Sequence, residues 1–417
     1  MMQETRDRIV LQKRELEAKL KEKYVERNAV LRIESSLIKV IAGPRRAGKS
    51  FFGLHFLKEK KFGYVNFDDE LLVNVTNYDE IVEAVNSVYD YPKYLLLDEI
   101  QNIPKWELFV NRLQRQGFNL IITGSNSHLL SRELATHLTG RHSLVNILPF
   151  SFNEYIKLDG EEHTTSETKT RLSLYLANGG YPEPLVKNLE LVEYLSLLFD
   201  AIIYKDIVKR YEIRNASEIE NLAFYLISNV STEYSYNSLT KVTGIKDSRT
   251  IEKYICYLEE AFVLFSLGRF SYKVKEQISS NKKIYCMDNG FIQAKAFKTS
   301  PDFGRLYENL VAIELKKREL DKKINIYYWK NIQQEEVDFV IKESTKVKQL
   351  IQVCFDVKAP ETKNREVRAL IKAGEELKCS NLLAITSDYE GSENVEWFGN
   401  KAKINFIPLW KWLLNQS

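Results

Sequence analysis

Cysteines are few in this chain, and long apolar runs are absent. Cys256, Cys286, Cys354 and Cys379 stand far apart and form no CxxC pair, so we expect reduced thiols rather than disulfides or zinc ligands. No stretch approaches the ~20 consecutive apolar residues that a membrane-spanning helix requires. The first residues are charged, unlike a signal peptide. We therefore expect a cytoplasmic protein without a membrane partner.

The chain also has little excess of either charge. Its 60 Lys and Arg residues and 57 Asp and Glu residues leave a formal net charge of +3, so any nucleic-acid surface must be confined to one part of the molecule. The 17 glycines and 9 prolines are too few for a fibrous or disordered protein, and the 44% hydrophobic content is that of a globular one. At 417 residues, two or three domains are expected.

Short apolar runs alternate with helical patterns in the region that we assign to residues 35–155. The expected strands are 37–42, 63–67, 94–98, 119–123 and 144–148, and the expected helices are 49–60, 78–89, 105–116 and 127–138. Strands that alternate with helices indicate βαβ units and a mainly parallel sheet. Residues 1–34 carry an amphipathic, mildly basic helical pattern. It is expected either to pack on the next domain or to bind nucleic acid or a partner.

Residues 43–50 match the phosphate-binding pattern GxxxxGK[ST] at every fixed position. An apolar strand precedes the loop and a helical pattern follows it, which is the context that this motif requires. Glycine lets the backbone N–H groups approach the phosphates, and Lys49 is expected to reach the β- and γ-phosphate oxygens. The residues expected to contact the nucleotide are Gly43, Pro44, Arg45, Arg46, Ala47, Gly48, Lys49, Ser50 and Phe51.

An acidic pair, Asp98-Glu99, stands at the end of the apolar run 94–98. Together with the hydroxyl of Ser50, Asp98 is expected to hold Mg²⁺, and Glu99 to polarise the attacking water. The predicted cofactors are therefore ATP and Mg²⁺. Carboxyl ends of parallel strands meet at one edge of the sheet. Ser125 or Asn126, after the next strand, is thus expected to sense the nucleotide, unless the segment is an ordinary turn.

Hydrolysis by proteins of this class needs a further cation on the transferred phosphate. Arg132 and Arg141 follow the strand that ends near Asn126. Either is expected to serve as an arginine finger, within one chain or from a neighbouring subunit of an oligomer. The alternative is an ordinary surface arginine.

Several further segments resemble a family of archaeal and bacterial AAA+-like ATPases. They are residues 97–101, 123–127, 138–141, 148–152, 179–183, 204–207, 250–254, 287–290, 307–311 and 336–339. In that family a conserved domain of unknown function follows the ATPase, and the resemblance covers nearly the whole chain. It implies an α/β protein with a P-loop core at 35–155, a helical lid at 156–215, a winged-helix domain at 216–298 and a restriction-nuclease-like α/β domain at 299–417.

The resemblance also implies roles for the lid and for the winged helix. In related ATPases the proline of a Gly-x-Pro element packs on adenine, and Pro182 stands at that position. A winged helix either binds double-stranded DNA or serves as a lid or protein dock, and acidic residues here interleave with the basic ones. The wing is expected from strands near 263–270 and 272–275. The candidates for phosphate contacts are Lys246, Arg249, Lys253, Arg269 and Lys273.

The last domain is expected to be a degenerate nuclease. Such sites need an acidic residue from a helix, an Asp on one strand and Glu-x-Lys on the next strand. Glu308 and Asp338 fit the first two positions. The third reads Gln352-Val353-Cys354, which lacks both the carboxylate and the lysine, and a hard cation wants several oxygen ligands. We expect this domain to bind a protein partner without cutting DNA.

The sequence as a whole predicts a Mg²⁺-dependent ATPase that acts as a nucleotide-driven switch or motor, with double-stranded DNA as a candidate partner. Two alternatives stay open. One is a DNA nuclease gated by ATP, and the other is an ATP-bound protein-interaction switch that does not hydrolyse its nucleotide. Glu99 favours hydrolysis, but an arginine finger that has not assembled would also leave the bound ATP without turnover.

Overall fold

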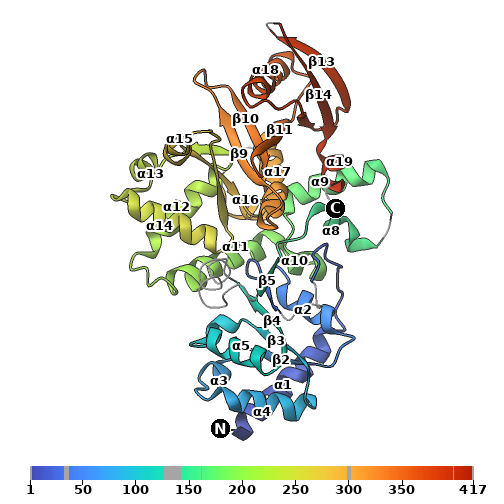
Figure 1. The fold of residues 1–417 in the computed structure, drawn as a ribbon, viewed down its shortest axis with the longest axis vertical. Helices are drawn as coiled ribbons and strands as arrows, with labels where there is room; N and C mark the ends of the chain where they lie inside the picture. The colour runs from blue at the N-terminus through green and yellow to red at the C-terminus, as the bar shows by residue number, and fades with distance from the viewer. Residues whose placement is uncertain are drawn as a thin grey trace. The chain divides into compact units, whose positions relative to one another are not determined.

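A computed structural model describes residues 2–31, 37–125, 142–160, 162–297, 302–397 and 399–415 (Figure 1). The chain divides into two units, one of Met1–Pro149 with Glu260–Phe262 and the other of Phe150–Glu259 with Val263–Ser417. Within the described ranges, no helix has both the length and the apolar content that a membrane crossing needs.

The first unit is built on a parallel sheet of five strands, in the order β2-β3-β4-β1-β5. Its strands are β1 (Ile38–Ala42), β2 (Phe62–Asn66), β3 (Tyr94–Asp98), β4 (Asn119–Gly124) and β5 (His142–Asn146). Its helices are α1 (Met2–Lys19), α2 (Lys49–Leu57), α3 (Glu70–Val73), α4 (Tyr78–Tyr89), the 3₁₀ turn η1 (Ile100–Asn102) and α5 (Trp106–Arg115). The parallel α/β architecture predicted from the alternating runs is confirmed.

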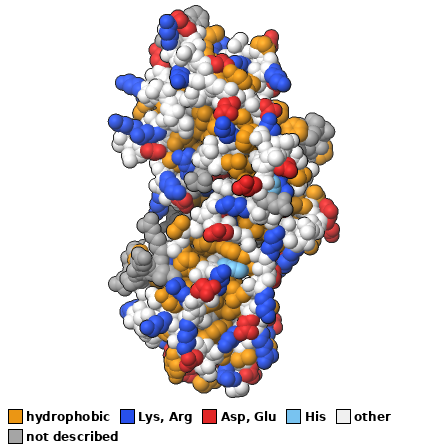
Figure 2. Space-filling view, turned by 90° about the vertical axis from the view of Figure 1, so that its right-hand side faces the viewer, with side chains coloured by type: hydrophobic (Ala, Val, Ile, Leu, Met, Phe, Trp, Pro, Cys, Tyr) orange, Lys and Arg blue, Asp and Glu red, His pale blue; other side chains and the backbone are white. Residues whose placement is uncertain are grey.

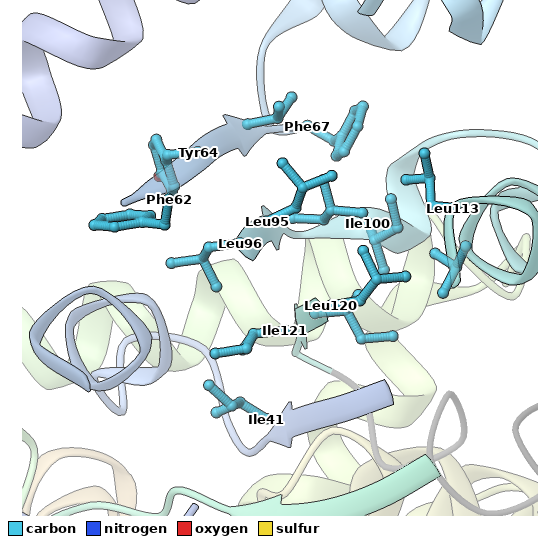
Figure 3. Packing of buried hydrophobic residues seen from close by; sticks show 14 of the residues in the cluster. Ile41, Phe62, Tyr64, Phe67, Leu95, Leu96, Ile100, Leu113, Leu120 and Ile121 are labelled. Atoms are coloured by element: carbon cyan, nitrogen blue, oxygen red, sulfur yellow. The ribbon is translucent and has the colours of Figure 1, made fainter. Parts of the chain in front are cut away.

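Side chains on both faces of the central strands are buried. Figure 3 shows Leu96, Ile121 and Ile41 in line on one face, while Leu95 and Leu120 point to the other. Strands covered on both faces are continuous apolar runs rather than alternating ones. Each such side chain contributes about 1.5–3 kcal/mol relative to an exposed position, so the core holds the strand ends in fixed positions.

Helix α1 covers the edge strand of this sheet. The Gln12 side chain donates from Nε2 to the Asn66 carbonyl at 3.0 Å and accepts from the Asn66 N–H at 2.9 Å. It thereby takes the place of a neighbouring strand, and an edge without such cover invites pairing with other chains. The N-terminal helical pattern was expected either to pack on the next domain or to bind nucleic acid or a partner. In the structure α1, which ends at Lys19, packs on the sheet.

The second unit starts with a series of helices. They are α8 (Phe152–Ile156), the 3₁₀ turn η2 (Lys157–Asp159), α9 (Thr165–Asn178), α10 (Pro182–Lys187), α11 (Leu191–Ala201) and the π-helical segment η3 (Ile202–Val208). Helix α9 begins at a capping box, in which the Thr164 and Glu167 side chains each accept the other residue's backbone N–H. It ends at Gly179, whose backbone lies at φ 72° and ψ −165°.

A three-stranded antiparallel sheet follows, with β8 between β6 and β7. The elements in chain order are α12 (Ala216–Ser228), β6 (Thr232–Tyr234), α13 (Tyr236–Thr243), α14 (Ser248–Glu260), β7 (Leu264–Gly268), α15 (Val274–Ser279), β8 (Lys282–Cys286) and α16 (Asn289–Lys295).

The strand expected at 272–275 is wrong, because α15 begins there and the second strand of the hairpin is β8. The Ser271 hydroxyl accepts the Lys273 N–H at 3.1 Å and donates to the Glu276 carboxylate at 3.0 Å. These local bonds favour a helical turn, and they form where the winged-helix resemblance implied a strand.

The C-terminal part of the second unit holds a mixed sheet in the order β13-β14-β12-β11-β10-β9. Its strands are β9 (Asn325–Lys330), β10 (Glu336–Glu343), β11 (Lys346–Cys354), β12 (Leu382–Thr386), β13 (Gly391–Trp397) and β14 (Asn400–Pro408), and its helices are α17 (Phe303–Leu320), α18 (Pro360–Glu376) and α19 (Leu409–Leu414). Strands β11, β12 and β14 run parallel, and the other neighbours are antiparallel. Helix α18 buries Leu370 and Ala373 against this sheet.

Candidate nucleotide-binding site

The phosphate-binding loop joins β1 to α2, and two of its positions require glycine. Gly43 lies at φ 150°, and a Cβ there would stand 1.8 Å from the Ile147 carbonyl oxygen. Gly48 is left-handed, at φ 92° and ψ 22°, directly before α2. The backbone N–H of Ala47 donates to the Pro44 carbonyl at 3.3 Å and closes the turn. The conformation thus explains both fixed glycines of the sequence pattern.

Lys49, the first residue of α2, lies inside the loop with its side chain 4% exposed. Its ammonium donates to the Pro44 carbonyl at 2.9 Å and stands 3.9 Å from Glu99 Oε1. The positive end of the helix dipole is at the same place. A buried ammonium beside a helix N-terminus is suited to a bound phosphate.

Asp98, at the end of β3, receives hydrogen bonds from three hydroxyl groups. Ser50 Oγ donates to Oδ1 at 2.7 Å, Thr123 Oγ1 donates to the same oxygen, and the Tyr64 hydroxyl donates to Oδ2 at 3.0 Å. Burial and then the neighbouring Glu99 raise the pKa of Asp98, while the three hydroxyls oppose that shift. The structure brings together the two predicted Mg²⁺ ligands, Ser50 and Asp98. Their oxygens are of the kind that Mg²⁺ prefers.

Glu99 is held beside this cluster in a strained backbone conformation. It lies at φ 51° and ψ 44°, which is unusual for a residue with a Cβ. Its N–H donates to Thr123 Oγ1 at 3.0 Å, and its carboxylate accepts from Gln101 Nε2. Thr123 therefore connects Asp98 to Glu99, and Gln101 fixes the direction of the Glu99 carboxylate.

Three residues of this cluster, Tyr64, Gln101 and Thr123, were not predicted. Thr123 carried a partial signal, since it ends the expected strand 119–123 as Asp98 ends 94–98, but only the structure shows that these two strands are neighbours. Tyr64 carried a weaker one, because it lies two residues before the end of β2. Gln101 belongs to the segment 97–101 that resembles the ATPase family, but the sequence does not indicate its contact.

Arg27 supports the loop from the N-terminal segment. Its Nη1 donates to the Ala47 carbonyl at 2.9 Å, and its Nη2 donates to the Leu148 carbonyl. It thereby joins the phosphate-binding loop to the segment after β5. No sequence pattern points to this contact, because the partners are backbone atoms far along the chain.

The other predicted contact residues are placed as follows. Pro44 and Ala47 are buried, Arg45 and Phe51 are half-buried, and Arg46 is exposed. Ser125 is buried, whereas Asn126, Arg132 and Arg141 lie outside the described residues. Pro182 opens α10 in the second unit, and its contact with adenine stays a prediction.

The candidate DNA contacts of the second unit fall into two groups. Lys246, Arg249 and Lys253 are exposed at the start of α14 and just before it. Arg269, in contrast, donates to the Lys330 carbonyl, and Lys273 pairs with Glu276 at 2.9 Å. On the face shown in Figure 2, Lys and Arg side chains are interspersed with Asp and Glu.

The three residues assigned to a degenerate nuclease site lie close together. Gln352 Oε1 accepts the Asp338 N–H at 3.1 Å, and the side chains of Glu308 and Asp338 both contact Lys283 Nζ, at 2.9 and 3.1 Å. A lysine was expected two residues after Gln352 and is absent there. In the structure a lysine of β8, Lys283, reaches these residues instead. Residue spacing along β11 could not reveal it, because Lys283 lies on another strand.

Comparisons with known proteins agree with this geometry. The family models that match are an AAA domain over residues 35–156, a domain of unknown function (DUF8612) over 169–302 and a second such domain (DUF4143) over 303–412. The uncharacterized protein MJ1544 of Methanocaldococcus jannaschii is 37% identical over 420 residues, covering 96% of this chain and 93% of the relative. An uncharacterized protein of Haemophilus influenzae is 28% identical, covering 78% of this chain and 84% of the relative.

Among solved structures, the Walker-type ATPase PABY2304 of Pyrococcus abyssi is similar with a TM-score of 0.41 and 14% identity, over 67% of this chain and 93% of that one. In this chain the AAA domain lies toward the N-terminus and DUF4143 toward the C-terminus, as the sequence resemblance implied. Because MJ1544 is 37% identical over 96% of this chain, the chain belongs to the same family, which is one of P-loop ATPases that carry a C-terminal domain of unknown function.

Proposed function

We propose that this chain binds ATP with Mg²⁺ in its first unit and hydrolyses the nucleotide as a switch or motor. The observation that carries the proposal is the convergence of four side chains at one sheet edge. Ser50 hydrogen-bonds Asp98 at 2.7 Å, and Lys49 stands 3.9 Å from Glu99. This arrangement supports nucleotide hydrolysis because it joins phosphate-binding, cation-binding and water-orienting groups.

Each group has a defined task in this proposal. The loop N–H groups and Lys49 neutralise the β- and γ-phosphate oxygens, and Ser50 and Asp98 would hold Mg²⁺, which neutralises further phosphate charge. Glu99 orients the attacking water, and Thr123 keeps its backbone in place. Arg141 or Arg132 supplies the remaining positive charge, and Pro182 packs on the adenine.

The second unit transmits the nucleotide state in this proposal. Its middle elements follow the order helix, strand, helix, helix, strand, strand, apart from the short α15, with the last strand in the centre of the sheet. That order supports a winged helix, and the exposed Lys246, Arg249 and Lys253 support duplex DNA as its partner. The C-terminal domain serves as a protein dock that does not cut DNA.

Replacing Lys49 with alanine is expected to weaken ATP binding by at least about a hundredfold, because its buried ammonium lies inside the phosphate-binding loop. Equilibrium binding of a fluorescent ATP analogue measures this effect. Lys58→Ala is the matched control, since Lys58 is exposed just past the end of the same helix. If Lys49→Ala binds ATP with wild-type affinity, the site is assigned wrongly.

Steady-state ATP turnover, measured over a series of protein concentrations with and without duplex DNA, distinguishes an assembling ATPase, a DNA-linked motor and a switch that does not hydrolyse ATP. Turnover per molecule that rises with concentration indicates a finger supplied by a neighbouring subunit, and turnover that rises with DNA indicates a DNA-linked motor. Negligible turnover under all conditions, with ATP tightly retained, would favour the alternative of a silent switch.

Replacing Thr123 with valine is expected to lower turnover by about ten- to a hundredfold, with ATP still bound. The change keeps the side-chain shape but removes a hydroxyl that donates to Asp98 and accepts from the Glu99 N–H. The orphaned N–H costs about 1–3 kcal/mol, which urea unfolding measures. Thr123→Ser retains the hydroxyl and should keep most activity, so equal losses in both variants would contradict the bridging role.

A further inference from the structure

Lys283, on the central strand β8 of the three-stranded sheet, points its ammonium into a group of carboxylates, of which Asp338 is buried and Glu308 and Glu336 are partly buried. Its side chain is 3% exposed. The Nζ atom lies 2.9 Å from Glu308 Oε1, 2.5 Å from Glu336 Oε1 and 3.1 Å from Asp338 Oδ1. Three carboxylates from α17 and β10 therefore meet at one cation that comes from a different sheet.

Each carboxylate is also oriented by a second partner. The Tyr285 hydroxyl donates to Glu308 at 2.8 Å, the Val353 N–H donates to Asp338 Oδ2 at 2.9 Å, and Lys330 Nζ stands 3.7 Å from Glu336 Oε2. The carboxylate oxygens thus converge on a position that the surrounding strands define.

The charges of this cluster depend on one another. Burial opposes the charge of Lys283, but the carboxylates, Glu308 first, outweigh it and raise the pKa of the ammonium. Burial and then Asp338 raise the pKa of Glu308 to about 8, and Lys283 acts against that rise. Removal of the ammonium would leave several buried acidic groups without a compensating cation, which proteins tolerate poorly.

An ammonium and a divalent metal ion are alternatives for such a position. Lys283 has three N–H donors, and its three carboxylate neighbours match that number. Mg²⁺ and Mn²⁺ prefer the same carboxylate oxygens, yet two cations cannot share the space at these distances. A metal could enter only where the ammonium leaves.

We propose that Lys283 is the resident cation of this carboxylate cluster, where it excludes divalent metal ions and fastens β8 to α17 and β10. The nuclease-like domain is then closed to metal by a residue of the preceding sheet, in addition to lacking the second carboxylate and lysine on β11. The same cluster helps to hold the three-stranded sheet against β10, together with the hydrogen bond from Arg269 to the Lys330 carbonyl.

Mn²⁺ binding to Lys283→Met tests the proposal, because methionine keeps much of the side-chain length without the charge. The full-length variant, without nucleotide, is expected to melt below wild type in metal-free buffer and to recover in Mn²⁺. Its Mn²⁺ affinity, measured by electron paramagnetic resonance, should exceed that of wild type by about tenfold or more. Adding Asp338→Asn should abolish the gain.

Lys282→Met is the matched control, since Lys282 precedes Lys283 on β8 and contacts the Tyr236 hydroxyl instead. It should bind no more Mn²⁺ than wild type. Wild-type Mn²⁺ binding that disappears in Asp338→Asn would overturn the proposal, as would a folded Lys283→Met that gains no affinity. If Lys283→Met folds only in Mn²⁺, the proposal is supported. If it never folds, Lys283→Gln decides by the same criterion, because its amide satisfies part of the cluster.

Discussion

Replacing Glu99 with glutamine is expected to lower ATP turnover by about a hundredfold or more while ATP stays bound. The amide retains the size of the side chain but cannot polarise a water molecule as a carboxylate does. The Glu99 backbone is already fixed by the bond from its N–H to Thr123 at 3.0 Å, so the variant should keep its position. Binding should persist because the proposed phosphate contacts, Lys49 and the loop, are unchanged.

Single-turnover phosphate release and retention of labelled ATP measure the two halves of this expectation. Glu59→Gln is the control, since Glu59 is an exposed carboxylate beyond the end of α2. Loss of both binding and turnover would mean that Glu99 supports the loop rather than the chemistry. Turnover at the wild-type rate would assign the water-orienting role to another residue.

The local part of the nucleotide site could be predicted because its chemistry lies in short segments. The loop pattern gave the positions of Lys49 and Ser50, and the apolar run 94–98 coincides with β3. Buried parallel strands are continuous apolar runs, so their signal survives without knowledge of the fold. The helix expected at 78–89 coincides with α4 because its apolar residues recur at helical spacing, and Ile81, Ala84 and Val85 form its buried face.

The contacts between distant segments could not be predicted from the same patterns. Thr123 and Tyr64 reach Asp98 only because β4 and β2 flank β3, and sequence alternation does not give strand order. Lys283 is a stronger case, since a pair of lysines, Lys282 and Lys283, at the start of a short strand is typical of an edge or surface position. Its partners lie in α17 and β10, and only the folded chain brings them together.

Strand β13 lacks the sequence signal that marks the central strands. The β13 segment, Gly391–Trp397, alternates between exposed and half-buried side chains and contains no apolar run. A search for apolar runs finds central strands, whereas an edge strand with one solvated face needs the period-two pattern. At residues 272–275 the winged-helix resemblance implied a strand, whereas a hydroxyl-capped helical turn forms there.

Asp288 holds together the turn after α9 and the start of α16. Its carboxylate accepts the N–H of Gly180 at 2.8 Å through Oδ2 and that of Gly290 at 2.8 Å through Oδ1. Burial raises the pKa of Asp288 to about 6. A raised carboxylate pKa means that its contribution to stability decreases as pH rises from about 4 to about 6, and the two N–H donors limit that loss.

Replacing Gly179 with alanine is therefore expected to destabilise the second unit by about 4 kcal/mol or more. The added Cβ would lie 1.8 Å from Asp288 Oδ1, so the carboxylate must move and leave two buried N–H groups unpaired. Gly160→Ala is the control for φ alone, because Gly160 has the same φ of 72° with nothing within 4 Å of its Cβ. Its ψ of 13° is left-handed, whereas the ψ of −165° at Gly179 adds backbone strain to the cost of Gly179→Ala. Gly160→Ala should cost only about 1 kcal/mol of backbone strain. Urea unfolding at pH 7.5 compares the two variants, and equal midpoints would show that Asp288 does not clamp this turn.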